Sequence, residues 1–159
     1  MDEILMMLQK DCRLPVKQMA AALGREEADV QAAIAGYEQD GTILKYTALI
    51  NPDKLAEESV TALIEVKISP QLGEGYDRIA QRIYQYDEVD SLYLMTGSYD
   101  LLVTMTAKSM KDAAQFVYTH LAAIDGVTST ATHFIMKKYK EQNCVFVKEP
   151  EQEERLFFI

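Results

Sequence analysis

Cysteine is scarce in this chain of 159 residues, and its scarcity excludes two kinds of site. The two cysteines, Cys12 and Cys144, lie far apart, and neither belongs to a Cys-x-x-Cys pair or has a histidine at ligand spacing. A disulfide framework and a zinc site both need such clustering. We therefore interpret both cysteines as small apolar residues, and the sequence indicates no metal and no other cofactor.

Long apolar runs are also missing. No run approaches the roughly 20 residues that a membrane-spanning helix needs, and the opening MDEILMMLQKD is acidic and amphipathic, unlike a secretory signal. With 48% apolar residues, the chain has enough material for the core of one ordinary domain or of two small ones. We therefore expect a soluble globular protein that is cytoplasmic and has no membrane partner.

Positively charged residues are also few in this chain. Lys and Arg total 16 against 25 Asp and Glu, which gives a net charge of -9 and a pI of about 4.7. Such a balance argues against a generally basic coat for nucleic acid. Any contact with nucleic acid must therefore come from a local basic patch.

The first fifty residues predict three short helices followed by a strand over 42–50. Pro15 suits the first turn of the second helix, and Gly24 can adopt the left-handed conformation that ends it. Two helices joined by a tight turn with glycine form the helix-turn-helix pattern, whose second helix enters the major groove of DNA. Taken alone the pattern is weak, because short helical hairpins are common. The apolar residues at helical spacing are Ile4, Leu5 and Leu8, then Met19, Ala22 and Leu23, then Val30, Ile34 and Tyr37.

A turn signal at Asn51-Pro52, followed by charged residues, separates this part from the rest. We place a helix-turn-helix domain with its connecting strand over 1–50 and a linker over 51–60. Beyond the linker, the patterns predict a strand over 61–69, a helix over 74–84, two strands over 89–107 that turn at Gly97-Ser98, a helix from Ser109 to Asp125, and a strand over 127–139.

The order strand, helix, strand, strand, helix, strand is that of the ferredoxin-like unit, here over 61–140, and the predicted fold class is α+β. One face of such a sheet stays free to pair with a second subunit, which favours a dimer. Residues 141–159 are expected to add a C-terminal strand and an acidic tail. The four apolar residues that end the tail, 156–159, either belong to a disordered segment or dock on the body or a neighbour, and we expect docking.

Several runs of residues carry a resemblance to a known family. LQKDCRL (8–14), LG (23–24), DGTILKYTALINPDKL (40–55), MTGSYDLL (95–102) and GVTSTATHFIM (126–136) resemble the Lrp/AsnC family of leucine-responsive, feast-or-famine transcription regulators. The runs cover nearly the whole chain in the right order, and GxIxxYTALxNP and GxYD are the most specific. The resemblance implies an N-terminal winged helix-turn-helix, a connecting strand, and a ferredoxin-like domain that dimerises and often assembles into octamers.

The resemblance also implies a function. Two dimer-related recognition helices would read half-sites on double-stranded DNA, and a small effector, usually an amino acid, would bind between dimers. The expected function is therefore sequence-specific transcriptional regulation of amino-acid metabolism in response to that effector.

The effector pocket implied by the resemblance lies at the GxYD turn and at the threonines of the last strand. Backbone N–H groups at a glycine turn can hold a carboxylate, Asp100 can pair with an ammonium group, and threonine hydroxyls can hydrogen-bond either. The alternative is structural: Gly97 makes the hairpin, Asp100 caps it, and the threonines follow strand propensity. The candidate residues are Gly97, Ser98, Tyr99, Asp100, Thr128, Thr130 and Thr132.

The candidate DNA-binding residues are two base readers and five phosphate anchors. Asp29 can accept from cytosine N4 and Gln31 can pair with adenine. Arg25-Glu26 stands where the family carries a Ser or Thr cap, and residues 1–50 hold five positive against eight negative charges, a net charge of -3. So few anchors imply weak binding per subunit, which a multimer offsets through effective concentration. The anchors are Lys10, Arg13, Lys17, Arg25 and Lys45.

Two other classes of function compete with a DNA-binding regulator. An enzyme is not indicated, because neither His120 nor His133 belongs to a Ser-His-acid or Cys-His arrangement, and no paired carboxylates stand at catalytic spacing. The alternative that remains open is a regulator-like, effector-sensing assembly protein with weak or lost DNA binding, which the acidic recognition region favours.

Overall fold

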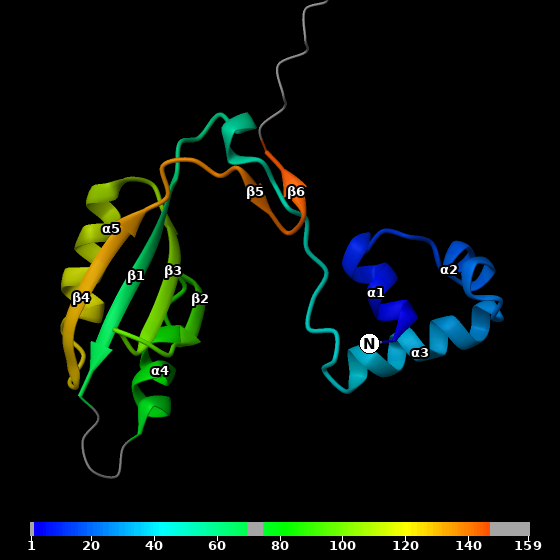
Figure 1. Ribbon diagram of the computed structural model, residues 1–159, viewed down its shortest axis with the longest axis horizontal. Helices are drawn as coiled ribbons and strands as arrows, with labels where there is room; N and C mark the ends of the chain where they lie inside the picture. Colours follow the sequence, from blue (N-terminus) through cyan, green and yellow to red (C-terminus); the bar gives the residue numbers. More distant parts are fainter. Residues whose placement is uncertain (1, 70–74, 147–159) are drawn as a thin grey trace, which may run out of the picture. The chain divides into compact units, whose positions relative to one another are not determined.

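The computed structural model of the chain describes residues 2–69 and 75–146 (Figure 1). The chain divides into two compact units, with the boundary between Ile50 and Asn51. In the part of the chain that the structure describes, no helix is long and apolar enough to cross a membrane.

The first unit consists of three helices, α1 Glu3–Lys10, α2 Val16–Leu23 and α3 Glu27–Gln39. The side chains predicted to face inward do so at Ile4, Met19 and Val30, which form a small core with Ala20. Ile34 and Tyr37 of α3 are partly buried against this core. The unit is therefore held together by one apolar stripe from each helix.

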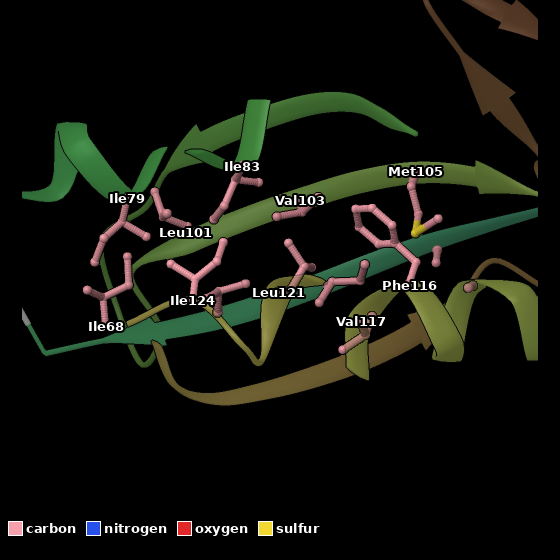
Figure 2. Packing of buried hydrophobic residues seen from close by; sticks show 14 residues of the cluster. Ile68, Ile79, Ile83, Leu101, Val103, Met105, Phe116, Val117, Leu121 and Ile124 are labelled. Carbon is pink, nitrogen blue, oxygen red and sulfur yellow. The ribbon is translucent and has the colours of Figure 1, made fainter. Parts of the chain in front are cut away.

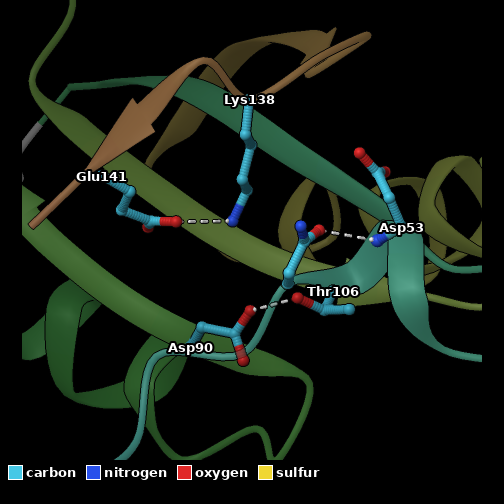
Figure 3. Close-up of polar contacts among 6 residues, drawn as sticks. Asp53, Asp90, Thr106, Lys138 and Glu141 are labelled. Carbon is cyan, nitrogen blue, oxygen red and sulfur yellow. Dashed lines mark hydrogen bonds and ion pairs between the residues drawn. The ribbon is translucent and has the colours of Figure 1, made fainter. Parts of the chain in front are cut away.

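Residues 42–50 do not form the connecting strand that the sequence predicted. No strand of the described residues pairs with this segment, and Leu44 and Ile50 are 89% and 60% exposed. A strand is built by hydrogen bonds to a neighbouring strand, so an alternating pattern without a partner gives an unpaired segment. The next turn is the short 3-10 helix η1 Pro52–Lys54, where the Asn51 side chain accepts a hydrogen bond from the Asp53 N–H at 3.0 Å (Figure 3).

The second unit is built on an antiparallel sheet of four strands in the order β2-β3-β1-β4. The strands are β1 Val60–Ile68, β2 Val89–Leu94, β3 Leu101–Ala107 and β4 Val127–Phe134. Helix α4 Tyr76–Tyr84 follows β1, and α5 Met110–Phe116 follows β3 and continues as the π-helix η2 Val117–Leu121. The predicted ferredoxin-like fold is confirmed, although the single helix expected after Ser109 is an α-helix followed by a π-helix.

The core of this unit lies between one face of the sheet and the two helices (Figure 2). Alternate residues of β1, namely Ala62, Ile64 and Val66, are fully buried, because side chains alternate between the two faces of a strand. Ile83 of α4 and Leu121 of η2 are also fully buried and belong to the same cluster.

The other face of the sheet carries the intervening residues of β1, which are half-buried at Leu63 and Glu65 and exposed at Lys67. Glu65 lies 3.2 Å from the Nε2 atom of His133 in β4. This face therefore mixes apolar and charged groups.

A short hairpin follows the sheet. Strands β5 Lys140–Glu141 and β6 Cys144–Val145 are joined by Gln142 and Asn143, both with positive φ, as a tight hairpin turn requires. The sequence predicted a C-terminal strand and tail over 141–159; the described part is this hairpin. The apolar end of the tail, predicted to dock, lies outside the described residues.

Candidate functional site

The turn between α2 and α3 is made by Gly24. Its φ of 63° and ψ of 33° are left-handed, and its N–H donates to the carbonyl oxygen of Ala20. The Arg25 N–H also donates to that oxygen, at 3.0 Å. These two hydrogen bonds to one carbonyl oxygen end α2 sharply, as is common where a glycine follows a helix. The chain can therefore begin α3 at Glu27 and pack it on α2.

All seven predicted DNA-binding side chains are exposed. They come from every part of the first unit: Lys10 from the end of α1, Arg13 from the following turn, Lys17 from α2, Arg25 from the α2–α3 turn, Asp29 and Gln31 from α3, and Lys45 from the segment 42–50.

The two predicted base readers of α3 do not share one side of the helix. Residues two positions apart in an α-helix lie about 200° apart around its axis, so Asp29 and Gln31 flank the buried Val30 on opposite sides. By the same geometry, the side of α3 opposite Val30 is formed by Ala28, Ala32 and Ala35. The sequence pattern had indicated alanines on the exposed side of this helix, but the base readers predicted from it were the polar residues Asp29 and Gln31.

The acidic side chains of α3 have local structural roles. Glu27 and Asp29 stand in the first turn, where the helix dipole favours negative charge. Near the other end, Glu38 accepts a hydrogen bond of 2.8 Å from the Tyr46 hydroxyl. Hydrogen bonds from the side chain and backbone of Thr42 lower the pKa of Asp40. The acidity of the region is therefore partly explained by helix and turn stability.

Asp2 and Tyr37 connect the start of α1 to α3. The Asp2 carboxylate accepts a hydrogen bond of 2.8 Å from the Ile4 N–H, which caps α1, and it also hydrogen-bonds Tyr37. The backbone bond, then the Tyr37 bond, lower the pKa of Asp2, with a smaller contribution from the Arg25 guanidinium. The positive charge of Arg25 therefore acts electrostatically on both Asp2 and Tyr37.

In the second unit, the predicted effector turn lies between β2 and β3. Gly97 has a φ of 128°, a conformation that favours glycine, and Gly97 and Ser98 are exposed while Tyr99 is half-buried. Asp100 is fixed by three bonds. Its N–H donates to Val66 at 3.0 Å, its carbonyl accepts from Met95 at 2.8 Å, and its carboxylate oxygen Oδ2 accepts from the Ile68 N–H at 2.7 Å.

Thr128 reaches the same peptide group as Asp100. Its hydroxyl donates to the carbonyl oxygen of Lys67 at 3.2 Å, next to a register shift in the β1–β4 pairing between Lys67 and Ile68. The Lys67 carbonyl and the Ile68 N–H belong to one peptide group and point to opposite sides of the strand. Asp100 from the β3 side and Thr128 from the β4 side therefore hold the end of β1 between them.

Thr130 and Thr132 are placed differently. They pair with Val66 and Ile64, whose side chains are buried under the helices, so both threonines lie on the helix-covered face of the edge strand. At about 3.4 Å per residue, Thr132 stands roughly 14 Å along the strand from Thr128. The structure thus gathers the turn and Thr128 at the end of β1, and it places Thr132 away from them.

Metal-binding clusters are absent from residues 2–69 and 75–146. In these ranges no three His, Cys, Asp or Glu side chains come close enough to hold a metal ion. Cys12 and Cys144 are free and exposed.

Comparison with known proteins agrees with the fold. Residues 61–145 match the Lrp/AsnC ligand binding domain. The chain is 43% identical over 145 residues to the uncharacterized HTH-type transcriptional regulator YugG of Bacillus subtilis, which covers 91% of this chain and 87% of that protein.

Solved structures show the same fold. An AsnC family transcriptional regulator from Agrobacterium tumefaciens is 26% identical with a TM-score of 0.71, covering 89% of this chain and 94% of that one. Regulator NMB0573 from Neisseria meningitidis, solved in complex with L-Met, is 23% identical with a TM-score of 0.72, covering 89% and 93%. With a profile match over more than half of its length and a relative at 43% identity, the chain belongs to the Lrp/AsnC family of HTH-type transcriptional regulators.

Proposed function

We propose that this protein is a sequence-specific DNA-binding regulator of amino-acid metabolism, and that an amino acid bound between dimers controls it. The observation that carries the proposal is the left-handed turn at Gly24, which ends α2 and presents α3 as the second helix of a helix-turn-helix pair. A homodimer would place two such helices on one side of double-stranded DNA, and an octamer would multiply them.

The alanine face of α3 sets the expected mode of base reading. Small side chains let the helix approach the floor of the major groove, where the methyl groups of Ala28 and Ala32 can contact thymine methyl groups. Asp29 and Gln31 then meet base edges from the two flanks of the helix. We therefore expect an operator in which thymines contribute much of the specificity.

Phosphate contacts supply most of the affinity of such an interface. The first unit has five exposed basic side chains but eight acidic residues, so we expect a single subunit to bind DNA weakly. Multivalent binding raises avidity by about 10² to 10⁴ when linked sites engage together. DNA binding by this protein is therefore expected to depend on assembly.

For the effector, the end of β1 is the proposed contact point. An amino acid offers an ammonium group to Asp100 and a carboxylate to the exposed N–H groups of the Gly97 turn. The complex of the Neisseria meningitidis regulator with L-Met makes amino acids the first class to test. An ammonium group that engages the Asp100 carboxylate competes with its bond to the Ile68 N–H, which links the ligand to the end of β1.

Fluorescence anisotropy on DNA from upstream of the protein's own gene tests the proposal. Affinity should fall steeply as salt rises, and Lys17→Ala should reduce the slope of log K against log salt by about 1. Lys111→Ala, an exposed lysine of α5 in the second unit, is the matched control and should leave the slope unchanged. The titration is repeated with each amino acid, and Asp100→Asn should abolish the response to the effector.

The second candidate function is an effector-sensing assembly protein that does not bind DNA. The observation that favours it is the charge of α3, where Glu26, Glu27 and Asp29 surround the helix start and only Arg25 is basic. Absence of salt-dependent DNA binding at low ionic strength, with effector binding retained in calorimetry, would establish this second function in place of the first.

A further inference from the structure

Helices α4 and α5 pack on one face of the four-stranded sheet, over the alternate residues of β1 that are buried (Figure 2). Paired residues of neighbouring strands lie on the same face of a sheet. The residues of β1 that face the other way are Thr61, Leu63, Glu65 and Lys67, and with their partners in the other strands they form what we call the open face. Tyr93 of β2 belongs to it and is 52% exposed. The open face therefore presents partly apolar surface to the outside of the unit.

The open face carries charged side chains of both signs. Glu65 and Lys67 come from β1 and His133 from β4, whereas the partners in β3 are leucine and threonine. Asp90 of β2 also belongs to this face, since the Thr106 hydroxyl donates a hydrogen bond of 2.8 Å to its Oδ2 atom (Figure 3). Two carboxylates and one lysine give a net charge of -1 while the histidine is neutral. Protonation of His133 therefore makes the open face neutral.

Glu65 and His133 are in direct contact on this face. The Nε2 atom of His133 lies 3.2 Å from the Oε1 atom of Glu65, and the two side chains are 58% and 34% exposed. Their neighbours across the sheet are apolar: Glu65 pairs with Leu102 of β3 and with Ala131 of β4, and His133 pairs with Leu63 of β1. The Glu65 carboxylate therefore stands among apolar side chains, with the imidazole as its adjacent polar group.

A second copy of this chain is the partner that the open face fits. An interface across a two-fold axis places the same surface on both subunits, so that surface must be complementary to itself. The whole chain has a net charge of -9, and two copies repel each other over most of their surface. The open face differs, because it combines apolar side chains with acidic and basic groups in nearly equal number. It is therefore suited to the homodimer that the proposed function requires.

We propose that the Glu65–His133 pair makes the homodimer sensitive to pH, an inference that rests on the dimer of the proposed function. Covering the open face removes water from the Glu65 carboxylate. A buried carboxylate is costly without a partner and much less so beside a protonated histidine, whose charge changes between pH 5 and 8. The dimer therefore binds more protons than two free subunits do. By linkage, association strengthens as the pH falls toward 5.5 and weakens as the pH rises toward 7.5.

Exchange of subunits between dimers tests this switch. Full-length chains carrying either a donor or an acceptor fluorophore on the N-terminal amine are mixed, and energy transfer reports the rate at which dimers dissociate and form again. The rates are compared at pH 5.5 and 7.5 at constant ionic strength, a range in which glutamate stays ionised. Each dimer contains two pairs, and differences in affinity appear mainly in the dissociation rate, so exchange should be about tenfold slower, or more, at pH 5.5.

Four variants assign the effect to the pair. In His133→Gln the two rates should agree within a factor of about two, because the titrating group is gone. In Glu65→Gln the order should reverse, because a protonated histidine on the covered face then has no carboxylate beside it. His120→Gln changes the other histidine of the chain, which stacks on Phe116 in the helix layer, and should keep the wild-type pH dependence. Lys67→Gln should keep its sign. The thermal unfolding midpoint confirms that each variant folds.

The outcomes separate this inference from the proposed function. Slower exchange at pH 5.5 in the wild type, equal rates in His133→Gln and the reversed order in Glu65→Gln support the switch. Equal rates in the wild type, or a pH dependence that survives in His133→Gln, would overturn the switch while leaving the DNA-binding function untouched. A chain that sediments as a monomer at both pH values would overturn the switch and the homodimer together, and the anisotropy titration on DNA then tests the remaining function by itself.

Discussion

Removal of the Asp100 side chain should destabilise the second unit, because this carboxylate completes the hydrogen bonding of β1. In Asp100→Ala the Ile68 N–H loses its acceptor, which lies at 2.7 Å, while the Ile68 side chain is only 8% exposed. A partly buried N–H left without a partner costs about 1 to 3 kcal/mol. At about 2 kcal/mol, the unfolding midpoint of a unit of this size falls by roughly 8 to 16 °C.

The assay is thermal unfolding followed by circular dichroism, combined with amide hydrogen exchange. Exchange at Ile68 should become about 30-fold faster in Asp100→Ala if the bond contributes about 2 kcal/mol to local stability. Asp100→Asn keeps an oxygen acceptor and should cost less than about 1 kcal/mol. Asp87→Ala, at an exposed position, should change the midpoint little.

Two results would refute the reasoning. If Asp100→Ala and Asp87→Ala unfold at the same temperature, the bond to Ile68 does not stabilise the unit. If the midpoint falls but the exchange rate of the Ile68 amide is unchanged, the loss comes from elsewhere in the turn. The first outcome would leave Asp100 with a role in ligand binding alone, and the second would assign its structural role to another contact of the turn.

Two further substitutions test other parts of the fold. Gly126→Ala should lower the free energy of unfolding in urea by about 1 to 3 kcal/mol, because Gly126 has a φ of 95° and the added Cβ would stand 2.8 Å from the side chain of Ile79 in α4. Gly36→Ala is the control: Gly36 has open space around it on α3, and this variant should be more stable by roughly 0.5 to 1 kcal/mol. The bonds from the Ile4 N–H and Tyr37 lower the pKa of Asp2, so the carboxylate stabilises the first unit above the unfolded pKa of 3.8, and this stabilisation is lost as the pH falls through the folded pKa. Tyr37→Phe should therefore lower stability at pH 7 and reduce the acid-induced loss below pH 3.8, and an unchanged acid transition would contradict this account.

Local patterns in the sequence were enough to predict the order of elements. The alternation over 61–69 and the apolar stripe over 74–84 predicted β1 and α4, and the Ser109 cap predicted the start of α5, where the Ser109 hydroxyl accepts from the Asp112 N–H at 3.1 Å. Each of these signals involves residues close in sequence, which share one face of one element. The ferredoxin-like order then followed from connectivity.

Contacts between distant residues were not predictable in the same way. The bond from the Ile68 N–H to Asp100 spans 32 positions, and the bond from Thr128 to Lys67 spans 61. Both depend on strand register, and the register shifts beside Lys67 and at Asp90 have no signature in the sequence. The same limit explains the error at 42–50, where the pattern gave no information about a partner strand.

The placement of Asp100 and Thr128 makes the structural and functional interpretations of the turn compatible. A carboxylate that caps a strand end can still bind an ammonium group, provided that it gives up or shares its bond to the Ile68 N–H. The free energy for that exchange must come from the ligand, since a ligand shifts a conformational equilibrium only by its differential affinity for the two states. An effector that binds Asp100 without disturbing Ile68 would leave β1 unchanged and transmit nothing along it. Protection of the Ile68 amide in the presence and absence of effector therefore distinguishes a ligand that merely occupies the turn from one that regulates through it.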